Sequence, residues 1–208
     1  MKVVIIGGVA GGVTAGTRLR RLDENARILI LERSGFVSYA NCGLPYYIGG
    51  EIRDAETLTL QTPNSLWNRY RIETRVRHEV KAICRGEKTV TVLDRDKGRE
   101  YQESYDKLIL APGAKPQRPP IPGVHNDRIY TLRTVEDMLL IAREAAAHRA
   151  KSSVVVGGGF IGLEMAENLR RLGMEVTLVE MHRQVLGQLD PDMAGFVHAH
   201  LRSSGVQL

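Results

Sequence analysis

Apolar runs and helical patterns alternate along the chain in an order that is used twice. Residues 3–33 read VVIIGGVAGGVTAGTRLRRLDENARILILER, and residues 154–180 read VVVGGGFIGLEMAENLRRLGMEVTLVE. Each copy is an apolar strand, a glycine-rich turn, a helix and a second apolar strand that runs to a glutamate. Since this order is typical of a βαβ unit, the pattern predicts two parallel-sheet units of the α/β class in one chain.

The chain between the two copies has a different pattern. Residues 64–77 begin as a helix and turn toward strand, residues 78–93 read as two strands joined by a turn at Gly86, and residues 105–111 read as another apolar strand. The segment APGAKPQRPPIPG follows, and its prolines exclude helix and central sheet because proline has no N–H and a fixed φ. We therefore expect a stiff linker there.

A further helix is expected between this linker and the second copy. Thr134 is its predicted N-cap, and the helix is expected to continue through His148. We therefore divide the chain into three parts. Residues 1–115 form the first part of one nucleotide-binding domain, residues 116–150 form a linker and connecting helix, and residues 151–208 form the N-terminal part of a second domain.

The glycine turn of the second copy matches a dinucleotide-binding fingerprint in full. Gly157 permits a tight turn, Gly159 lets the backbone approach a pyrophosphate, and Gly162 lets helix and strand pack closely. The phosphates would then meet the amides of the helix N-terminus. Glu180 stands at the end of the second strand, where it can accept hydrogen bonds from an adenosine ribose. Its charge favours NADH over NADPH, although a nearby histidine and arginine weaken that preference.

The first copy departs from the fingerprint at its centre. Gly7 and Gly12 are in place, but Val9 occupies the middle position, with further glycines beside it that relieve crowding. Glu32 repeats the ribose carboxylate. One such turn alone could be a purely structural βα connection. Two in register, each with strand, helix and terminal glutamate, favour two dinucleotides, which suggests FAD exchanging electrons with NAD(P)H.

Cys42 is the candidate reactive residue. It lies in the segment SYANCGLPYYIGG at residues 38–50, just after the first βαβ unit. Gly43 and the residues after it suit a turn into a helix, with Pro45 tolerated in the first turn. A helix N-terminus stabilises a thiolate, and the thiolate is the form that attacks disulfides. A buried apolar cysteine is the alternative, which the neighbouring dinucleotide unit makes less attractive.

No local dithiol can form at this cysteine. A C-x-x-x-x-C pair would need its second cysteine where the chain has Tyr47. A redox cycle at Cys42 would therefore pass through a mixed disulfide, a sulfenic acid or a persulfide. Cys84 falls in a predicted hairpin strand and is expected to be a structural residue.

The first helix carries a basic stripe. Thr14, Arg18 and Arg21 follow each other at helical spacing and share one face, whereas Arg20 points elsewhere. Two guanidiniums and a hydroxyl on one face could grip the phosphates of a substrate. A solvated basic face with no ligand is the alternative.

Composition adds little to this picture. The net charge of +5 comes from Lys and Arg interleaved with acids, so a general surplus is favoured over a nucleic-acid surface. No apolar stretch of about 18 residues suggests a membrane span. Glycines interrupt the apolar N-terminus, which we interpret as a strand rather than an export signal, so reduced thiols and a cytoplasmic location are expected. No metal site is expected.

Five segments together resemble one known group of enzymes. They are GGVAGG, SYANCGLPYYIGG, LILAPGAKP, GGGFIGLE and LDPDMAGF. They are similar to the coenzyme A-disulfide reductase group, which includes NADH-dependent persulfide and polysulfide reductases and belongs to the FAD-dependent pyridine nucleotide–disulfide oxidoreductases. The resemblance implies two Rossmann-like, three-layer domains, FAD-binding and then NAD(P)-binding, both incomplete within 208 residues, and a homodimer for the full-length protein.

The resemblance also implies roles for individual residues. Glu32 would hold the FAD ribose, Val80 would contact adenine through its backbone, and Glu164 would lie beside the nicotinamide. The implied cofactor-binding set comprises Gly7, Gly8, Ala10, Gly11, Gly12, Glu32, Arg33, Val80, Ala111, Pro112, Gly113, Gly157, Gly159, Phe160, Ile161, Gly162, Glu164 and Glu180.

The implied chemistry centres on Cys42, assisted by Ser38 and Asn41. Electrons from NADH would pass through FAD to this cysteine, which would attack coenzyme A disulfide, persulfide or polysulfide. The basic stripe of Thr14, Arg18 and Arg21 would be substrate-binding, since the family contacts coenzyme A there.

Two alternatives stay open. Related NADH oxidases and peroxidases cycle through a cysteine sulfenic acid, but they carry a histidine where this chain has Ala10. Because family members are about twice as long or more, the chain could also be a fragment without turnover.

Overall fold

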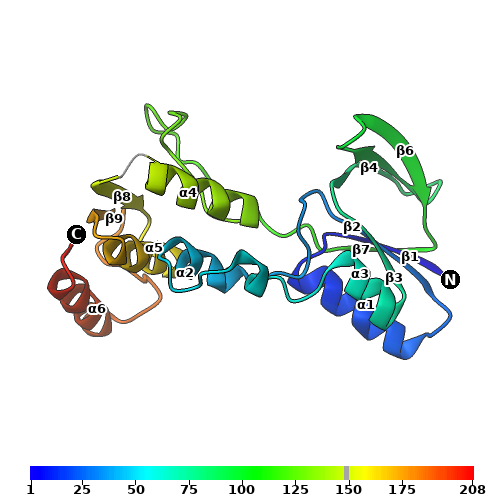
Figure 1. Ribbon diagram of the computed structural model, residues 1–208, viewed down its shortest axis with the longest axis horizontal. Helices are drawn as coiled ribbons and strands as arrows, with labels where there is room; N and C mark the ends of the chain where they lie inside the picture. The colour runs from blue at the N-terminus through cyan, green and yellow to red at the C-terminus, as the bar shows by residue number, and fades with distance from the viewer. Residues whose placement is uncertain (148–149) are drawn as a thin grey trace. The chain divides into compact units, whose positions relative to one another are not determined.

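The computed structural model describes residues 1–147 and 150–208. Contacts divide the chain into two compact units (Figure 1), Met1–Ala40 with Leu58–Gln117, and Asn41–Thr57 with Arg118–Leu208. The segment that carries Cys42 therefore groups with the second unit, although it precedes the linker in sequence. The domain boundaries predicted at 115 and 150 stay predictions.

A parallel sheet forms the centre of the first unit. Its strand order is β3-β2-β1-β7, and the register places Val3 opposite Ile28 and Lys107. Helix α1 connects β1 to β2, as the βαβ pattern predicts. The bounds of the elements around this sheet are β1 Lys2–Ile6, α1 Ala10–Leu22, β2 Arg27–Leu31, α3 Pro63–Tyr70, β3 Ile72–Arg75 and β7 Lys107–Leu110.

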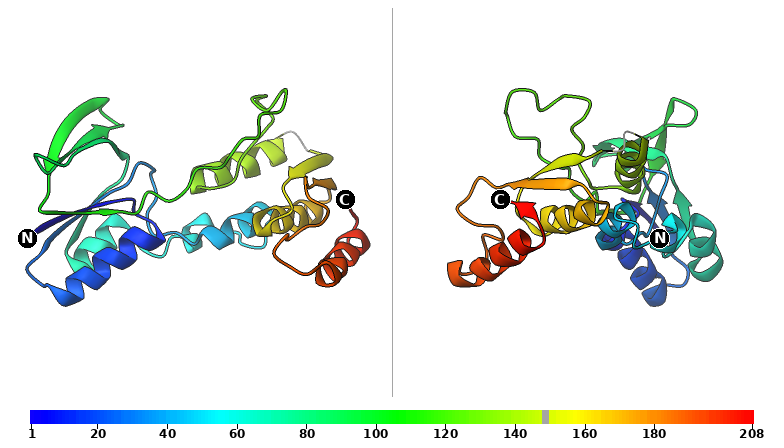
Figure 2. Two further views of the ribbon diagram at one scale, coloured as in Figure 1. Left: turned by 180° about the vertical axis from the view of Figure 1, so that it is seen from behind. Right: turned by 60° about the vertical axis from the view of Figure 1, so that its left-hand side comes forward.

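Side chains that alternate along these strands bury both faces of the sheet. On one face, Ile5 and Ile30 pack in a cluster with Leu66 of α3. On the other face, Val4 and Leu29 pack against β5 of a three-stranded antiparallel layer. Figures 1 and 2 show α1 and α3 on one side of the sheet and the antiparallel strands on the other. The first unit thus has the three layers expected of it.

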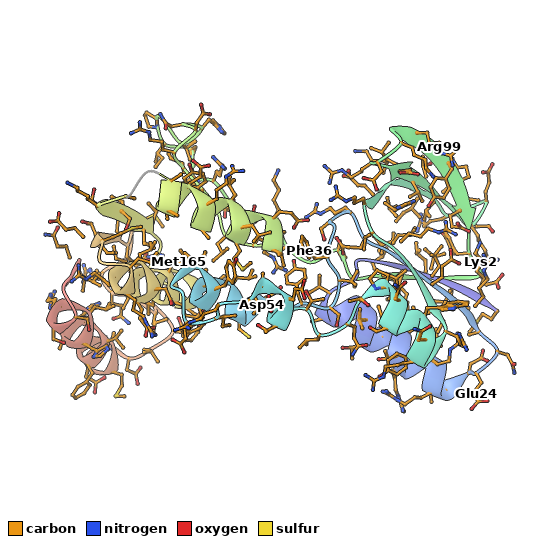
Figure 3. The ribbon with its side chains drawn as sticks, viewed as in Figure 1. Lys2, Glu24, Phe36, Asp54, Arg99 and Met165 are labelled. Atoms are coloured by element: carbon orange, nitrogen blue, oxygen red, sulfur yellow. The ribbon has the colours of Figure 1, made fainter. Side chains whose placement is uncertain are left out.

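The antiparallel layer contains a strand that the sequence analysis missed. Its strands are β4 His78–Cys84, β5 Thr89–Asp94 and β6 Arg99–Ser104, in the order β4-β5-β6. The first two form the predicted hairpin around Gly86. The missed strand, β6, is the segment REYQES, which lies mostly exposed at the layer's edge and lacks an apolar run. Lys2 of β1, labelled in Figure 3, forms an ion pair with Glu103 of this strand.

The second unit repeats the parallel βαβ order. Its sheet has the order β10-β9-β8, and Met165 of α5, labelled in Figure 3, is buried in this unit. Short helix α2 contacts both α4 and α5. The bounds are α2 Leu44–Ile48, α4 Val135–Ala147, β8 Ser152–Val156, α5 Phe160–Arg171, β9 Glu175–Val179, α6 Pro191–Ser203 and β10 Val206–Gln207, with 3-10 turns η1 Asn41–Gly43 and η2 Ala55–Leu58.

The connection to the second copy follows the prediction. No helix or strand forms from 111 to 134, where the prolines are concentrated. Thr134 caps α4, because its Oγ1 accepts the N–H of Asp137 at 3.2 Å and its own N–H donates to Asp137 Oδ2 at 2.9 Å. The predicted helix end, His148, lies outside the described residues. Within the described ranges, no helix has the length and apolarity needed to cross a membrane.

Candidate functional site

The first glycine turn is a tightly packed backbone cradle. Gly7 adopts φ +102°, and a Cβ there would lie 2.0 Å from the carbonyl oxygen of Ala111. A Cβ on Gly12 would lie 1.8 Å from the carbonyl oxygen of Gly7. The N–H of Gly8 donates to Glu32 Oε2 at 2.7 Å, and the N–H of Ser34 donates to the other carboxylate oxygen at 2.8 Å. Close approach of the backbone thus explains why Gly7 and Gly12 have no side chain.

The second glycine turn has the same internal geometry. Gly157 adopts φ +109°, and a Cβ on Gly162 would lie 1.9 Å from its carbonyl oxygen. The N–H of Gly158 donates to Glu180 Oε2 at 2.6 Å, and the N–H of His182 donates to Glu180 Oε1 at 2.9 Å. The bond from His182, and after it the bond from Gly158, lowers the pKa of the Glu180 carboxyl, which therefore carries its charge at neutral pH.

The repeat extends into the loop that follows each glutamate, which the sequence analysis missed. Val37 and Val185 each pack on the second glycine of their turn, where a Cβ would meet them at 2.9 and 2.8 Å. The residue after each valine, Ser38 or Leu186, adopts φ +48°. Its N–H donates to the carbonyl of Gly8 or Gly158 at 2.8 Å. The two loop sequences, VSY at residues 37–39 and VLG at residues 185–187, share only the valine, so their similarity is not evident from the sequence.

Both turns suit a dinucleotide. The first amides of α1 and α5 have no acceptor within their helices, so they are available to phosphate oxygens. Each carboxylate oxygen of Glu32 and Glu180 can accept more than the one bond described above, which leaves capacity for ribose hydroxyls. A Cβ on Gly159 would meet nothing within 4 Å, so space remains where a pyrophosphate would approach. Val9 occupies the equivalent position with φ −102°, which does not require glycine.

The remaining predicted cofactor residues surround these turns in their own units. In the first unit, Ala111 follows β7 and its N–H donates to the carbonyl of Ile6 at 2.8 Å. Val80 lies on β4 beside a register shift in the pairing with β5. The other members are exposed or half-buried, and they are Ala10, Gly11, Arg33, Pro112 and Gly113 in the first unit and Phe160, Ile161 and Glu164 in the second. Their cofactor contacts stay predictions.

Cys42 lies in turn η1 directly before α2, as the sequence predicts. It is exposed and, within the described chain, forms no disulfide. Pro45 lies in the first turn of α2. The Oδ1 atom of Asn41 is buried without a hydrogen-bond partner among the described residues. Cys84 is exposed at the end of β4, in the predicted hairpin strand, and its interpretation as a structural residue stays a prediction.

Helix α2 packs on α5, the helix that follows the second glycine turn. Glu51 forms an ion pair with Arg171, and a Cβ on Gly49 would lie 2.0 Å from Asn168 Oδ1. Burial raises the pKa of Tyr46, and the charges of Glu164 and, more weakly, Cys42 raise it further. The second unit therefore brings the cysteine segment and the predicted nicotinamide acid together. Ser38, the other predicted assistant, belongs to the first unit.

The basic stripe of α1 is present as predicted. Thr14, Arg18 and Arg21 are all exposed. No hydrogen bond or ion pair involves the side chain of either arginine within residues 1–147 and 150–208. In contrast, Arg20 donates to the carbonyl oxygens of Tyr70 at 2.8 Å and Arg71 at 3.0 Å. Arg20 thus holds the end of α3, whereas the stripe is left for solvent or a ligand.

A comparison with known families identifies the chain. The family model described as "Pyridine nucleotide-disulphide oxidoreductase" matches residues 1–208. The chain belongs to this family. Pyridine nucleotide–disulphide oxidoreductases use FAD and NAD(P)H, so the two dinucleotides inferred from the paired glycine turns are confirmed, as are the Rossmann-like α/β fold and the resemblance stated above.

The relatives of this pyridine nucleotide–disulphide oxidoreductase include sulfur reductases. Coenzyme A disulfide reductase of Staphylococcus haemolyticus is 39% identical over 202 residues, which cover 97% of this chain and 45% of the relative. The reduced CoADR-RHD of Bacillus anthracis is 46% identical with a TM-score of 0.97, and the match covers 100% of this chain and 37% of that one.

Two further solved structures broaden the range of activities. A NAD-dependent persulfide reductase from A. fulgidus is 38% identical with a TM-score of 0.94, covering 100% of this chain and 39% of that one. A water-forming NADH oxidase from Lactobacillus brevis, bound to NADH, is 32% identical with a TM-score of 0.93, covering 100% and 46%. The chain thus spans less than half the length of these proteins.

Proposed function

We propose that the chain is the nucleotide-binding part of an NAD(P)H- and FAD-dependent reductase of coenzyme A disulfide, persulfide or polysulfide, with Cys42 as its single redox-active residue. The observation that carries this proposal is the setting of Cys42. The thiol is exposed, Tyr47 stands where a second cysteine would be needed for a dithiol, and the segment packs on α5. Relatives with a high sequence identity are named for these activities.

Each unit has a proposed cofactor. Glu32 and the amides of α1 would hold FAD, together with Ala111 and the residues after it. Glu180 and the amides of α5 would hold NAD(P)H, and the charge of Glu180 would favour NADH because it repels a 2′-phosphate. When bound, FAD accepts a hydride from NAD(P)H and makes electrons available to a sulfur centre.

The chain's own residues would handle the substrate. The Cys42 thiolate attacks one sulfur of an R–S–S–R substrate, so that a Cys42–S–S–R bond forms and one thiolate leaves. Two electrons then break this bond, which restores the Cys42 thiolate and releases the second thiolate. Tyr46 holds its proton at the phenol oxygen because its pKa is raised by burial first and by the nearby acids second. The stripe of Arg18 and Arg21 would bind the phosphates of coenzyme A.

One second function has support from a specific observation. The similarity to the NADH oxidase of Lactobacillus brevis favours reduction of oxygen or peroxide. In this chain Ala10 stands where such enzymes carry a histidine acid/base, so we rank that activity second. The cytoplasmic location and the homodimer stay predictions.

The experiment begins with the colour of the purified chain. If the chain binds FAD, the purified protein should be yellow, and its flavin absorbance should decrease when NADH is added. Turnover of coenzyme A disulfide, a persulfide and peroxide is then compared for the unmodified chain, Cys42→Ser and the matched control Cys84→Ser. We expect only Cys42→Ser to lose turnover of the sulfur substrates. Colourless protein, or equal rates in the two variants, would contradict the proposal, and turnover of peroxide alone would favour the second function.

A further inference from the structure

The loop at residues 181–189 forms one wall of a cavity of about 210 Å³ beside Glu180. Besides that carboxylate, the side chains that line the cavity and can carry a charge are those of His182, Arg183, His198 and Arg202, and Leu208 lines it as well. His198 and Arg202 belong to α6, which the sequence analysis did not connect with any site. His198 therefore lines the same cavity as Glu180, the proposed ribose carboxylate.

His198 holds the loop by one hydrogen bond. The backbone N–H of Val185 donates to His198 Nε2 at 3.1 Å. A backbone amide can only donate, so Nε2 is the acceptor of this bond. Val185 is 2% exposed, so water cannot easily replace the ring as the acceptor.

The residue held in this way sits directly against the dinucleotide turn. The side chain of Val185 fills the space over Gly158, and the next residue, Leu186, donates its N–H to the carbonyl of Gly158 at 2.8 Å. On its other side, Gly158 donates its N–H to Glu180. A chain of contacts thus runs from α6 through the loop to the peptide that aligns the ribose carboxylate.

The equivalent loop of the first unit is held differently. There the N–H of Leu60 donates to the carbonyl of Ser38 at 2.8 Å, and the N–H of Ala40 donates to the carbonyl of Leu58 at 2.9 Å. Main-chain bonds therefore fix the first loop after its valine. The second loop also has a main-chain bond, from the N–H of Leu189 to the carbonyl of Leu186 at 2.8 Å, but the N–H of its valine is held by a side chain from a separate helix.

We propose that His198, through its acceptor atom Nε2, is a positioning residue of the NAD(P)H site, which it keeps in order by holding the 181–189 loop against Gly158. The inference rests on the proposed assignment of the second unit to NAD(P)H.

The test measures NADH affinity of the whole 208-residue chain, together with its melting temperature. His198→Leu keeps bulk but has no acceptor, whereas His198→Gln places an oxygen near the position of Nε2. His200→Leu is the control, since His200 is exposed on the same helix. We expect His198→Leu to weaken NADH binding about fivefold, the effect of one lost hydrogen bond, while His198→Gln and His200→Leu bind within about twofold of the unmodified chain.

A second readout tests the ring itself. Imidazole nitrogen NMR should show Nε2 of His198 as a hydrogen-bond acceptor in the unmodified chain. Unchanged affinity in folded His198→Leu would overturn the inference and leave the proposed function standing. Equal losses in both His198 variants would assign the effect to ring packing and also overturn it. If the unmodified chain binds no NADH, the proposed function fails first and the positioning role fails with it.

Discussion

The two glycine turns have the same backbone but different surroundings. A Cβ on Gly7 would collide with the chain after β7, whereas a Cβ on Gly157 would meet nothing within 4 Å. In the first unit β7 pairs beside β1, whereas among the described residues of the second unit β8 is an edge strand, and this difference between neighbours accounts for the difference within the 208-residue chain. The comparison shows that local backbone geometry is the same in both nucleotide turns. Whether a turn tolerates a side chain at its first glycine depends on the strand beside it.

The sheets around the turns differ in the same way. The first sheet is buried on both faces, by helices on one side and the antiparallel layer on the other. In the 208-residue chain, which spans less than half the length of its relatives, Val154, Val156 and Val179 of the second sheet are 65%, 66% and 48% exposed. Within this chain, substitutions at matching positions should therefore cost more in the first unit than in the second.

The largest expected difference is between Gly7→Ala and Gly157→Ala. Both residues have positive φ, which costs a substituted side chain about 1–3 kcal/mol. Gly7→Ala adds a backbone collision and should lose about 3–5 kcal/mol in total. Urea unfolding followed by fluorescence of Trp67, the chain's single tryptophan, reports on the first unit, and circular dichroism reports on both.

The pair Gly12→Ala and Gly162→Ala is the control for this comparison. Their Cβ atoms would lie 1.8 and 1.9 Å from equivalent carbonyl oxygens, so both substitutions should be severe. If Gly7→Ala and Gly157→Ala instead cost the same free energy of unfolding, the neighbouring strand has no role in the difference.

The next largest difference concerns the two ribose carboxylates. Glu32→Ala leaves the N–H groups of Gly8 and Ser34 without their acceptor in a buried site and should lower the free energy of unfolding by about 2–3 kcal/mol. Glu180 is more exposed, and Glu180→Ala should cost about 1 kcal/mol because water can replace the carboxylate. Chemical unfolding measures both, and a larger loss for Glu180→Ala would contradict the comparison.

A smaller effect separates two arginines of α1. Arg20 donates to carbonyl oxygens at the end of α3, so Arg20→Ala should cost about 1–2 kcal/mol. Arg18→Ala removes no described contact and should change the free energy of unfolding by less than about 0.5 kcal/mol, while it raises the concentration of coenzyme A disulfide needed for turnover. Thermal unfolding measures the loss of stability, and steady-state kinetics measures the change in substrate concentration. If Arg18→Ala lowered stability and left the kinetics unchanged, Arg18 would have no role in substrate binding.

The smallest expected effect is a pH dependence at Glu180. Its pKa is lowered in the folded chain by the N–H groups of His182 and then Gly158. A carboxyl with a lowered folded pKa stabilises the fold above its unfolded pKa, and that contribution is lost as pH falls through the folded pKa. Between about pH 6 and about pH 3, the unmodified chain should therefore lose more stability than Glu180→Gln. If the free energy of unfolding had the same pH dependence in both proteins, the Glu180 carboxyl would not be the cause of this effect.

Much of this architecture could be predicted from sequence, since it depends on short-range patterns. Alternating apolar strands, the glycine spacing, the prolines after Ala111 and the cap at Thr134 each specify local structure. Strand β6 was missed because its polar segment is held by pairing with β5 and by ion pairs such as that of Lys2 with Glu103.

The site was harder to predict where it depends on contacts between distant segments. Cys42 was identified from its motif, but the packing of the following helix α2 on α5 depends on residues more than a hundred positions apart. The same holds for His198, whose role depends on a hydrogen bond to Val185, and no motif marks it in the sequence. The exposure of Cys84 also depends on which end of a hairpin meets the core.

The central claim is that a single redox cysteine is served by two dinucleotide turns. The most direct test is mass spectrometry of the FAD-loaded chain after treatment with coenzyme A disulfide. We predict one coenzyme A adduct, located on Cys42, that disappears when NADH is added without oxygen. In Gly159→Val the adduct should form but should persist, since the added side chain would occupy the space in which the NADH pyrophosphate approaches the second turn. An adduct on Cys84, or a Cys42 adduct that NADH leaves in place in the unmodified chain, would contradict the claim.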